Sequence, residues 1–284
     1  MTLIHTDALK DGFALLLRHP RAVLAASGVC AGIAALEALV FSLTGEAGPG
    51  LIGVTLLFIL GFHAWVIAAV LVTRAALDSP AGSVRERARD VSRLVLVAGL
   101  TLILVLTVLG TAFVVLAFML GALAILGAER TGQTEPPEGF VNIFALFNTT
   151  EWIIAVVLIA AWSMFALWFI SRLLPAIPAT LARGQVQLLA AWPILQGRGL
   201  GGFITGTLAV LPGVALLVAF AFLVESATGY NPAQGVGADG LNPLAIALAR
   251  ALLVGASAGL VLAPLMGVHA RLFMKFASQT PQKA

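Results

Sequence analysis

The sequence predicts an all-α, polytopic integral membrane protein with six transmembrane helices and cytoplasmic amphipathic segments. Of its 284 residues, 60% are hydrophobic and only 10% are charged, and the mean hydropathy is +1.05. Soluble domains have about 45–50% apolar and about 25% charged residues, so this chain has too few charges to build a surface that faces water. The composition excludes a soluble globular protein and a disordered chain. We expect residues 1–284 to form a single transmembrane domain.

Six apolar segments are long enough to cross a bilayer, whose core of ~30 Å takes roughly 20 helical residues. We predict spans at 21–44, 51–73, 94–126, 152–174, 200–224 and 243–273. The third and sixth spans are longer than the others, so they are expected to tilt or to extend past the hydrocarbon. Pro212 and Pro264 lie inside the fifth and sixth spans. Each is expected to kink its helix, because proline removes a backbone donor.

The distribution of positive charge predicts the orientation. With the N-terminus inside, 14 of the 16 Lys and Arg residues fall in cytoplasmic segments. The outside loops then hold only Arg130, and Arg250 lies within a span. Basic residues are retained on the cytoplasmic side, so both termini are predicted to be cytoplasmic. Because these residues sit at the ends of apolar runs, the pI near 9.6 does not indicate a nucleic-acid partner.

A basic segment with helical amphipathic spacing precedes each pair of spans, at 7–19, 83–93 and 181–198. Such segments predict helices at the membrane interface that contact anionic lipid headgroups or a partner protein. The alternation is either a three-fold structural repeat or only the pattern of any six-span chain with both ends inside. The candidate contacts are Arg18, Arg21, Arg85, Arg87, Arg89, Arg93, Arg183, Trp192 and Arg198.

Two opposite charges lie at the same predicted depth. Glu37 and Arg250 are each about seven residues inside the outer end of their span, which is ~10 Å at the helical rise. A charge at the centre of a span costs roughly 2.5–3.5 kcal/mol, so a partner is expected. Three interpretations stay open: an ion pair between the first and sixth spans, separate extension of each side chain to the outer interface, or a role in moving a substrate or a proton.

His63 lies near the middle of the second span among apolar neighbours. It is interpreted either as a neutral histidine hydrogen-bonded to another helix or as a metal or haem ligand. A ligand would need a second histidine at similar depth, and the other three lie near the cytoplasmic side. The sequence contains no catalytic set and no metal-ligand cluster. We therefore expect no enzyme activity, no metal and no cofactor.

Glycines four residues apart recur within the predicted spans, as Gly28/Gly32, Gly202/Gly206 and Gly255/Gly259. Small residues at this spacing let two helix backbones approach closely. With 29 glycines in the chain some of these matches are expected by chance, so the pairs indicate tight helix packing and say little about dimerisation.

The segment between the fourth and fifth spans carries a recognisable layout. It reads Ala191-Trp192, then Pro193, then Gly197-Arg198-Gly199 directly before the fifth span. This arrangement resembles the six-helix bacterial membrane domain attached to some glycerophosphodiester phosphodiesterases and its free-standing relatives, which carry Ala-Trp and then Arg-Gly. Pro193 and the order Gly-Arg-Gly depart from that pattern. The resemblance implies a bacterial inner-membrane accessory domain without known catalytic residues, and no phosphodiesterase domain is present.

The function expected from these features is that of a non-catalytic inner-membrane accessory, scaffold or lipid-contacting protein, or a subunit of a membrane complex. Its expected partners are membrane lipids, other integral membrane proteins or a second copy of the chain. The alternative is a small transporter or channel that uses Glu37, Arg250 and His63. That alternative needs a water-accessible cavity that reaches Glu37 or His63.

Overall fold

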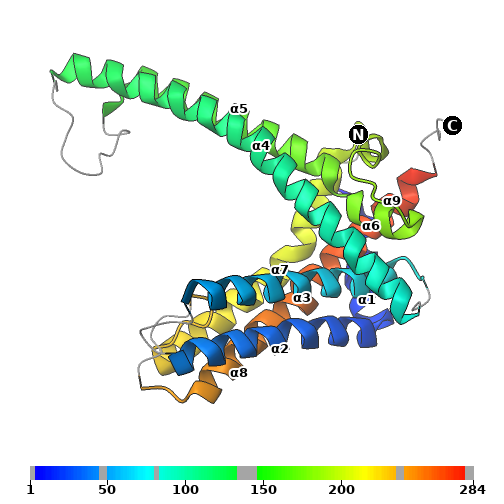
Figure 1. Cartoon of the computed structure of the whole chain (residues 1–284). Coiled ribbons are helices and arrows are strands. Elements are labelled where there is room, and N and C mark those ends of the chain that lie inside the picture. Colours follow the sequence, from blue (N-terminus) through cyan, green and yellow to red (C-terminus); the bar gives the residue numbers. More distant parts are fainter. Residues whose placement is uncertain (1–3, 45–49, 80–82, 133–145, 235–239, 279–284) are drawn as a thin grey trace. The chain divides into compact units, whose positions relative to one another are not determined.

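Helices form nearly the whole described chain. The computed structural model describes residues 4–44, 50–79, 83–132, 146–234 and 240–278. Helices take up 87% of these residues, and no strand occurs among them, so the predicted all-α class is confirmed. Six helical segments are long and apolar enough to cross a membrane (Figure 1): α2 (Pro20–Thr44), α3 (Gly50–Ala76), α4 (Val84–Thr131), α5 (Thr149–Leu173) with α6 (Ala176–Arg183), α7 (Gly199–Thr228), and the stretch Pro243–Ala277.

Most helix bounds lie within a few residues of the predicted spans, and α4 is the exception. It has 48 residues, because the predicted amphipathic segment 83–93 continues into the apolar run without a break. No glycine or proline interrupts residues 84–98. Ser83 and Glu86 form a capping box at the start: the Glu86 N–H donates to Ser83 Oγ at 3.3 Å, and the Ser83 N–H donates to Glu86 Oε2 at 2.7 Å.

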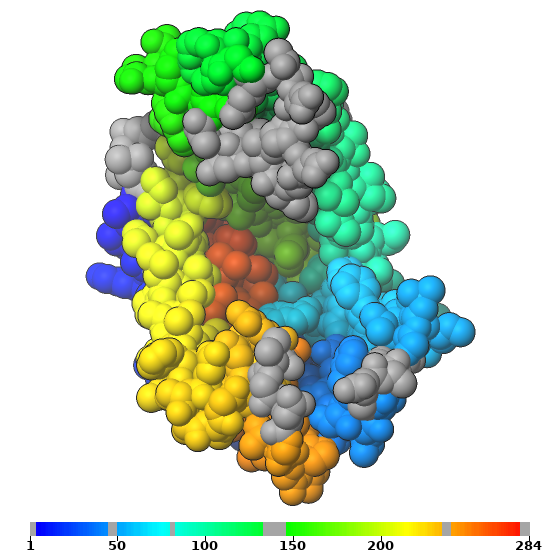
Figure 2. Space-filling view, turned by 90° about the vertical axis from the view of Figure 1, so that its left-hand side faces the viewer, coloured from blue at the N-terminus to red at the C-terminus, as the bar shows by residue number. Residues whose placement is uncertain are grey.

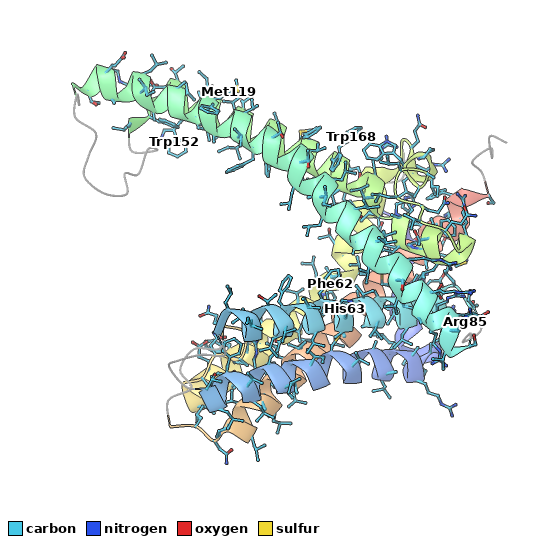
Figure 3. The ribbon with its side chains drawn as sticks, viewed as in Figure 1. Phe62, His63, Arg85, Met119, Trp152 and Trp168 are labelled. Atoms are coloured by element: carbon cyan, nitrogen blue, oxygen red, sulfur yellow. The ribbon has the colours of Figure 1, made fainter. Side chains whose placement is uncertain are left out.

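The chain forms two compact units, which are described separately. Unit 1 comprises residues 1–98 and 172–284, and unit 2 comprises residues 99–171. In unit 2, Leu116, Leu120 and Ala124 follow one another every four residues on α4 and pack with the buried Ala155 of α5. Arg130 Nη1 lies 2.7 Å from Glu151 Oε1. Trp152 and Trp168 lie along α5 of this unit (Figure 3).

In unit 1, α2 packs against both α3 and α8 (Pro243–Ser257). The buried residues of α2 are small and recur every three or four positions: Val23, Ala26, Cys30, Ala34 and Ala38. A Cβ at Gly255 of α8 would lie 2.9 Å from Ala31 Cβ and 3.1 Å from the Ser27 carbonyl oxygen. The backbones of α2 and α8 therefore approach so closely that only glycine fits at position 255.

The first predicted amphipathic segment is a separate helix, α1 (Thr6–Arg18), which packs on α9 (Ala263–Ala277). It ends at Arg18, because His19 precedes Pro20 and proline disfavours the helical conformation of the residue before it. Ala8, Gly12 and Leu15 are its buried residues. The helix thus docks through one face onto the last helix of the chain.

Close packing occurs at two of the three glycine pairs. Gly202 and Gly206 contact Leu272 and Leu265 of α9, and Gly255 and Gly259 contact α2. A Cβ added at Gly28 or Gly32 would meet nothing within 4 Å. Tight packing therefore occurs at two of the pairs, whereas Gly28/Gly32 has no neighbour, since residue spacing does not identify which face of a helix has one.

The third amphipathic segment, 181–198, is not the helix that was predicted. Helix α6 ends at Arg183, followed by Gly184 in the left-handed region at φ 63°. Turns then lead to a short 3₁₀ helix, η3 (Trp192–Leu195), and Gly197 is left-handed at φ 74°. Left-handed residues interrupt an α-helix, so the amphipathic spacing of this segment does not produce one. Leu188 is buried here, whereas Val186 and Leu189 are exposed. The three basic segments thus take three different forms.

The sixth span is not one uninterrupted α-helix. Helix α8 leads into a π-helical segment, η4 (Ala258–Leu262), and then into α9. Pro264 is the second residue after η4 and removes one backbone donor, so the irregularity lies within one turn of the proline. The start of α8 is capped by Asn242, whose Oδ1 accepts from the Leu244 N–H at 2.8 Å.

Candidate functional site

Unit 1 contains a pocket of about 770 Å³ where the α1–α2 junction meets the end of α3 and the first turn of α4. Four guanidinium groups line it against one carboxylate, and apolar side chains form the rest of the wall. We call it the arginine pocket. Its defining residues are Arg18, Arg21, Arg74, Arg87, Asp78, Val70 and Leu71. A basic rim beside an apolar wall suits a molecule with an anionic head and an apolar body.

Local structure brings Arg18 and Arg21 to this pocket. Arg18 is the last residue of α1, Arg21 is in the first turn of α2, and both are exposed. His19 lies between the two helices, with Nε2 3.1 Å from Asp78 Oδ1. Asp78 follows the end of α3 at φ 49°, in the left-handed region that aspartate tolerates better than most residues. This contact joins the α1–α2 junction to the end of α3.

A buried carboxylate fixes the third arginine. Asp90 of α4 is 1% exposed. Arg74 Nε donates to Asp90 Oδ2 at 2.8 Å, and Arg74 Nη2 donates to the same oxygen. Arg93 Nη1 donates to Asp90 Oδ1 at 3.3 Å. Two cations thus compensate the desolvated carboxylate, and Arg74 is held in the pocket wall.

The structure brings only some of the predicted headgroup contacts together. Arg18, Arg21 and Arg87 line the arginine pocket. Arg85 and Arg89 are exposed on α4 and do not line it, and Figure 3 shows Arg85 at the start of that helix. Arg93 is bound to Asp90 as described above.

The remaining three predicted contacts lie in the segment 183–198, away from this lining. Arg183 Nη1 donates to Gln187 Oε1 at 2.9 Å. The Arg198 guanidinium lies 4.4 Å from the centre of the Phe276 ring, a cation–π contact. Trp192 begins η3 and is half-buried. These side chains therefore do not share one site with Arg18, Arg21 and Arg87.

Sequence reasoning missed Arg74 and Asp90. Their interaction joins residues of two helices that are 16 positions apart in the sequence, and nothing in the local spacing indicates it. The available signal was one aspartate among the arginines of the segment 83–93, the only acidic residue there besides the capping Glu86.

A second pocket, of about 400 Å³, lies between α2, α8 and the chain that leads to α8. Glu37 and Arg250 both line it, and we call it the Glu37 pocket. Ser42, Phe41 and Tyr230 are also in its lining. Burial raises the pKa of Tyr230 above its ordinary value, so its hydroxyl stays protonated. Of the predicted candidates, the structure thus brings Glu37 and Arg250 to one site.

Arg250 is held by backbone carbonyls. Its Nη1 donates to the Pro232 oxygen at 2.6 Å and to the Ala233 oxygen at 3.2 Å. Glu37 is near enough to Arg250 for a Coulombic interaction, although no salt bridge joins them in the described residues. Their direct ion pair stays a prediction. A Glu37→Arg, Arg250→Glu exchange that restores the folded yield lost in each single variant would demonstrate it.

His63 lies in neither pocket. Its Nδ1 is 2.8 Å from the Ile59 carbonyl oxygen, one turn back on α3, so its hydrogen bond is made within its own helix. Its ring and that of Phe62 form a T-shaped pair with centres 5.9 Å apart, and Figure 3 labels both residues on α3. Among the described residues, no group of three His, Cys, Asp or Glu side chains could hold a metal ion. The structure therefore does not bring His63 to Glu37 and Arg250.

No known protein family, curated protein or solved structure matches this chain. The residues that carry the resemblance to the six-helix bacterial domain lie between α6 and α7. Ala191 is buried, Trp192 begins η3, and Arg198 precedes α7. The resemblance to that domain, and the bacterial inner-membrane location that it implies, stay expectations.

Proposed function

We propose that this multi-pass membrane protein binds anionic phospholipid headgroups through the arginine pocket. Its role is that of a non-catalytic accessory or scaffold protein in a bacterial inner membrane. The observation that supports this proposal is the pocket lining, which has four guanidinium groups, a single carboxylate and the apolar Val70 and Leu71. Arginine binds phosphate oxygens with two hydrogen bonds at a time, while an apolar wall accommodates the first carbons of an acyl chain.

The expected orientation agrees with this ligand. The lining arginines belong to the segments predicted to be cytoplasmic, together with both termini. The cytoplasmic leaflet carries anionic lipids, and each basic side chain near that surface contributes about 1 kcal/mol to binding. A pocket with four such groups would therefore favour an anionic lipid over a neutral one.

The experiment compares lipid binding by the whole purified protein in two double variants. Arg21→Gln with Arg87→Gln removes two charges from the pocket lining. Arg85→Gln with Arg89→Gln removes two charges from the neighbouring surface of α4. We expect the first variant to lose most of its preference for phosphatidylglycerol over phosphatidylcholine in native mass spectrometry. The second variant should keep that preference, and equal losses in both would overturn the proposal.

An accessory or scaffold role also requires a protein partner. Gentle extraction with a C-terminal tag, followed by native mass spectrometry of the intact complex, is expected to show a stoichiometric membrane protein or a second copy of this chain. Recovery of the chain with lipid alone would contradict the subunit role and leave the lipid-binding role to be judged by the arginine variants.

A small transporter or channel is the second candidate, supported by the Glu37 pocket. Glu37 and Arg250 share this 400 Å³ space, whereas His63 is not in its lining. Cysteines introduced beside Glu37, in a chain with Cys30→Ala, report whether water reaches the pocket. Labelling from both sides of the membrane would support transport, and labelling from one side only would contradict it.

A further inference from the structure

The Glu37 pocket contains a carboxylate that lacks a bonded partner. Among the described residues, neither a hydrogen bond nor a salt bridge to Glu37 occurs. Its Oε1 lies 2.9 Å from the position that a Cβ on Gly61 would occupy, so the carboxylate rests against the bare backbone of α3. Its charge is therefore available to a ligand that enters the pocket.

Arg250 connects this pocket to a second space. It lines the Glu37 pocket together with Ile246, and it also lines a groove of about 530 Å³ between α7 and α8. The carbonyl bonds of Arg250 use Nη1 alone. Its Nη2 and Nε make no hydrogen bond in the described chain, so they can donate to an anionic ligand that lies between the two spaces.

The groove is polar at one end and apolar along its length. Glu225 and Asn231 form its polar end, with Asn231 Nδ2 donating to Glu225 Oε2 at 2.8 Å. From there it follows α7 and α8 past Val218 and Leu253 to Ser257, towards the middle of both spans. Figure 2 shows α7, in yellow, beside α8, in orange. An open apolar groove along two membrane-spanning helices suits an acyl chain.

We propose that this site binds one phospholipid whose headgroup carries a primary ammonium. The ammonium donates hydrogen bonds to the Glu37 carboxylate. The phosphate lies at Arg250, which joins the two spaces. One acyl chain lies in the groove between α7 and α8. The ligand therefore supplies a cation for Glu37 and an anion for Arg250 at the same time.

The ligand chemistry follows from the two charges. A purely anionic lipid would leave Glu37 unpaired and add a repelling charge beside it. A quaternary ammonium carries the right charge and has no N–H to donate. A primary ammonium has three donors, and hydrogen bonds that involve a charged group are stronger than neutral ones. This site is independent of the arginine pocket, whose residues it does not share.

The test measures lipid binding to the whole protein by native mass spectrometry with phosphatidylethanolamine, its N-methyl and N,N-dimethyl forms, and phosphatidylcholine. We expect affinity to fall as N–H donors are lost, with about a tenfold difference or more between the first and last lipids, the scale of a hydrogen bond to a charged group. Glu37→Gln should abolish the difference. The matched control is Glu129→Gln, which removes an exposed carboxylate of unit 2 and should leave the difference unchanged.

Two further variants distinguish a lipid from a soluble amine. Val218→Trp fills the groove, and Leu216→Trp adds the same bulk to an exposed position on α7 outside it. Val218→Trp should weaken phosphatidylethanolamine at least about tenfold relative to Leu216→Trp. Binding of O-phosphoethanolamine as tight as that of the lipid would overturn the lipid assignment. Persistence of the phosphatidylethanolamine preference in Glu37→Gln would overturn the site itself, whether or not the arginine-pocket variants behave as proposed.

Discussion

Gly12 and Gly267 face each other where α1 crosses α9. A Cβ on Gly267 would lie 2.8 Å from the Gly12 Cα, and a Cβ on Gly12 would lie 2.8 Å from the Pro264 carbonyl oxygen. Both obstacles are backbone atoms, so neither can rotate away. Around this contact, Arg271 Nε lies 2.9 Å from Asp11 Oδ2 and Lys275 Nζ lies 3.8 Å from Asp7 Oδ2. Exposed pairs of this kind contribute only about 0–1 kcal/mol, so α1 docks mainly through its buried face, where Leu15 packs with Met266 and the two backbones meet at Gly12.

Gly267→Ala is therefore expected to separate α1 from α9 at a cost of about 1–3 kcal/mol, the range for overpacking a close contact. The measurement is the midpoint of thermal unfolding in detergent, together with the rate of trypsin cleavage after Arg18. Gly28→Ala is the matched control, since a Cβ there meets nothing within 4 Å. Alanine favours a helix over glycine by about 1 kcal/mol, so the control should be neutral or stabilising. Equal behaviour of the two variants would show that α1 docks in another way.

Asp90→Asn should destabilise the protein by about 1–3 kcal/mol, because it removes the negative charge shared by Arg74 and Arg93 and replaces one acceptor oxygen with an NH₂ donor. Both guanidinium groups are partly exposed and can be hydrated in part, which keeps the cost below that of a fully buried charge. Chemical denaturation in a mild detergent measures it. Asp78→Asn provides the comparison, as that side chain is 81% exposed and should change stability by less than about 0.5 kcal/mol. A cost for Asp90→Asn no larger than this would contradict the network.

Acidification is expected to loosen the N-terminal helix through His5. Its backbone N–H donates to Thr205 Oγ1 at 3.0 Å, and its ring packs against Phe276 at 5.5 Å. Burial lowers the pKa of His5, and the nearby Lys275 and Arg198 lower that pKa further. As the pH falls below about 6.5, the unfolded chain takes up a proton at this residue before the folded chain does. Stability contributed by neutral His5 is therefore present above that pH and is lost below it.

The measurement is the unfolding midpoint between pH 7 and pH 5 for the wild type and for His5→Gln. All other titrating groups are common to the two proteins. The wild type should lose more stability on acidification than the variant does. Parallel curves for the two proteins would mean that His5 has the same pKa folded and unfolded.

Gly61→Ala should displace the Glu37 carboxylate without unfolding the protein. The atom in the way of the new methyl group is the far end of a flexible side chain, 2.9 Å from the added Cβ. The change should leave the unfolding midpoint unchanged or raised, since alanine favours the helix. In the same variant, the preference for phosphatidylethanolamine over phosphatidylcholine should fall. If the preference were retained, the Glu37 carboxylate would not bind the lipid from its position against Gly61.

The length and apolar character of the runs predicted the spans because crossing a bilayer demands about 20 apolar helical residues. Whether the helix continues beyond the end of an apolar run was harder to predict. The segment 83–93 continues into α4, since nothing there stops a helix, whereas 181–198 breaks at Gly184 and Gly197. Both segments were expected to be amphipathic helices, and the second differs in containing two left-handed glycines and Pro193.

The sequence identified candidate-site residues where their charge and their position next to an apolar run were sufficient. Arg18, Arg21 and Arg87 could be chosen because basic residues gather at the ends of apolar runs. Arg74 binds Asp90, and Arg250 binds the Pro232 and Ala233 carbonyls, through contacts between segments that are distant in the sequence. Spacing along one helix carries no information about such partners, so depth placed Glu37 and Arg250 together without indicating the carbonyl partners of Arg250.

The π-helical segment η4 sets the rotational phase of the chain's last helix. An α-helix turns by about 100° per residue, and a π segment holds an additional residue within its turn. If the same residues formed a plain α-helix through Ala258–Leu262, everything after them would be rotated by about that angle relative to α8. Gly255 would still face α2 while Gly267 turned away from Gly12. The extra residue of the π turn therefore allows Gly255 and Gly267, on one continuous segment, to contact two different helices.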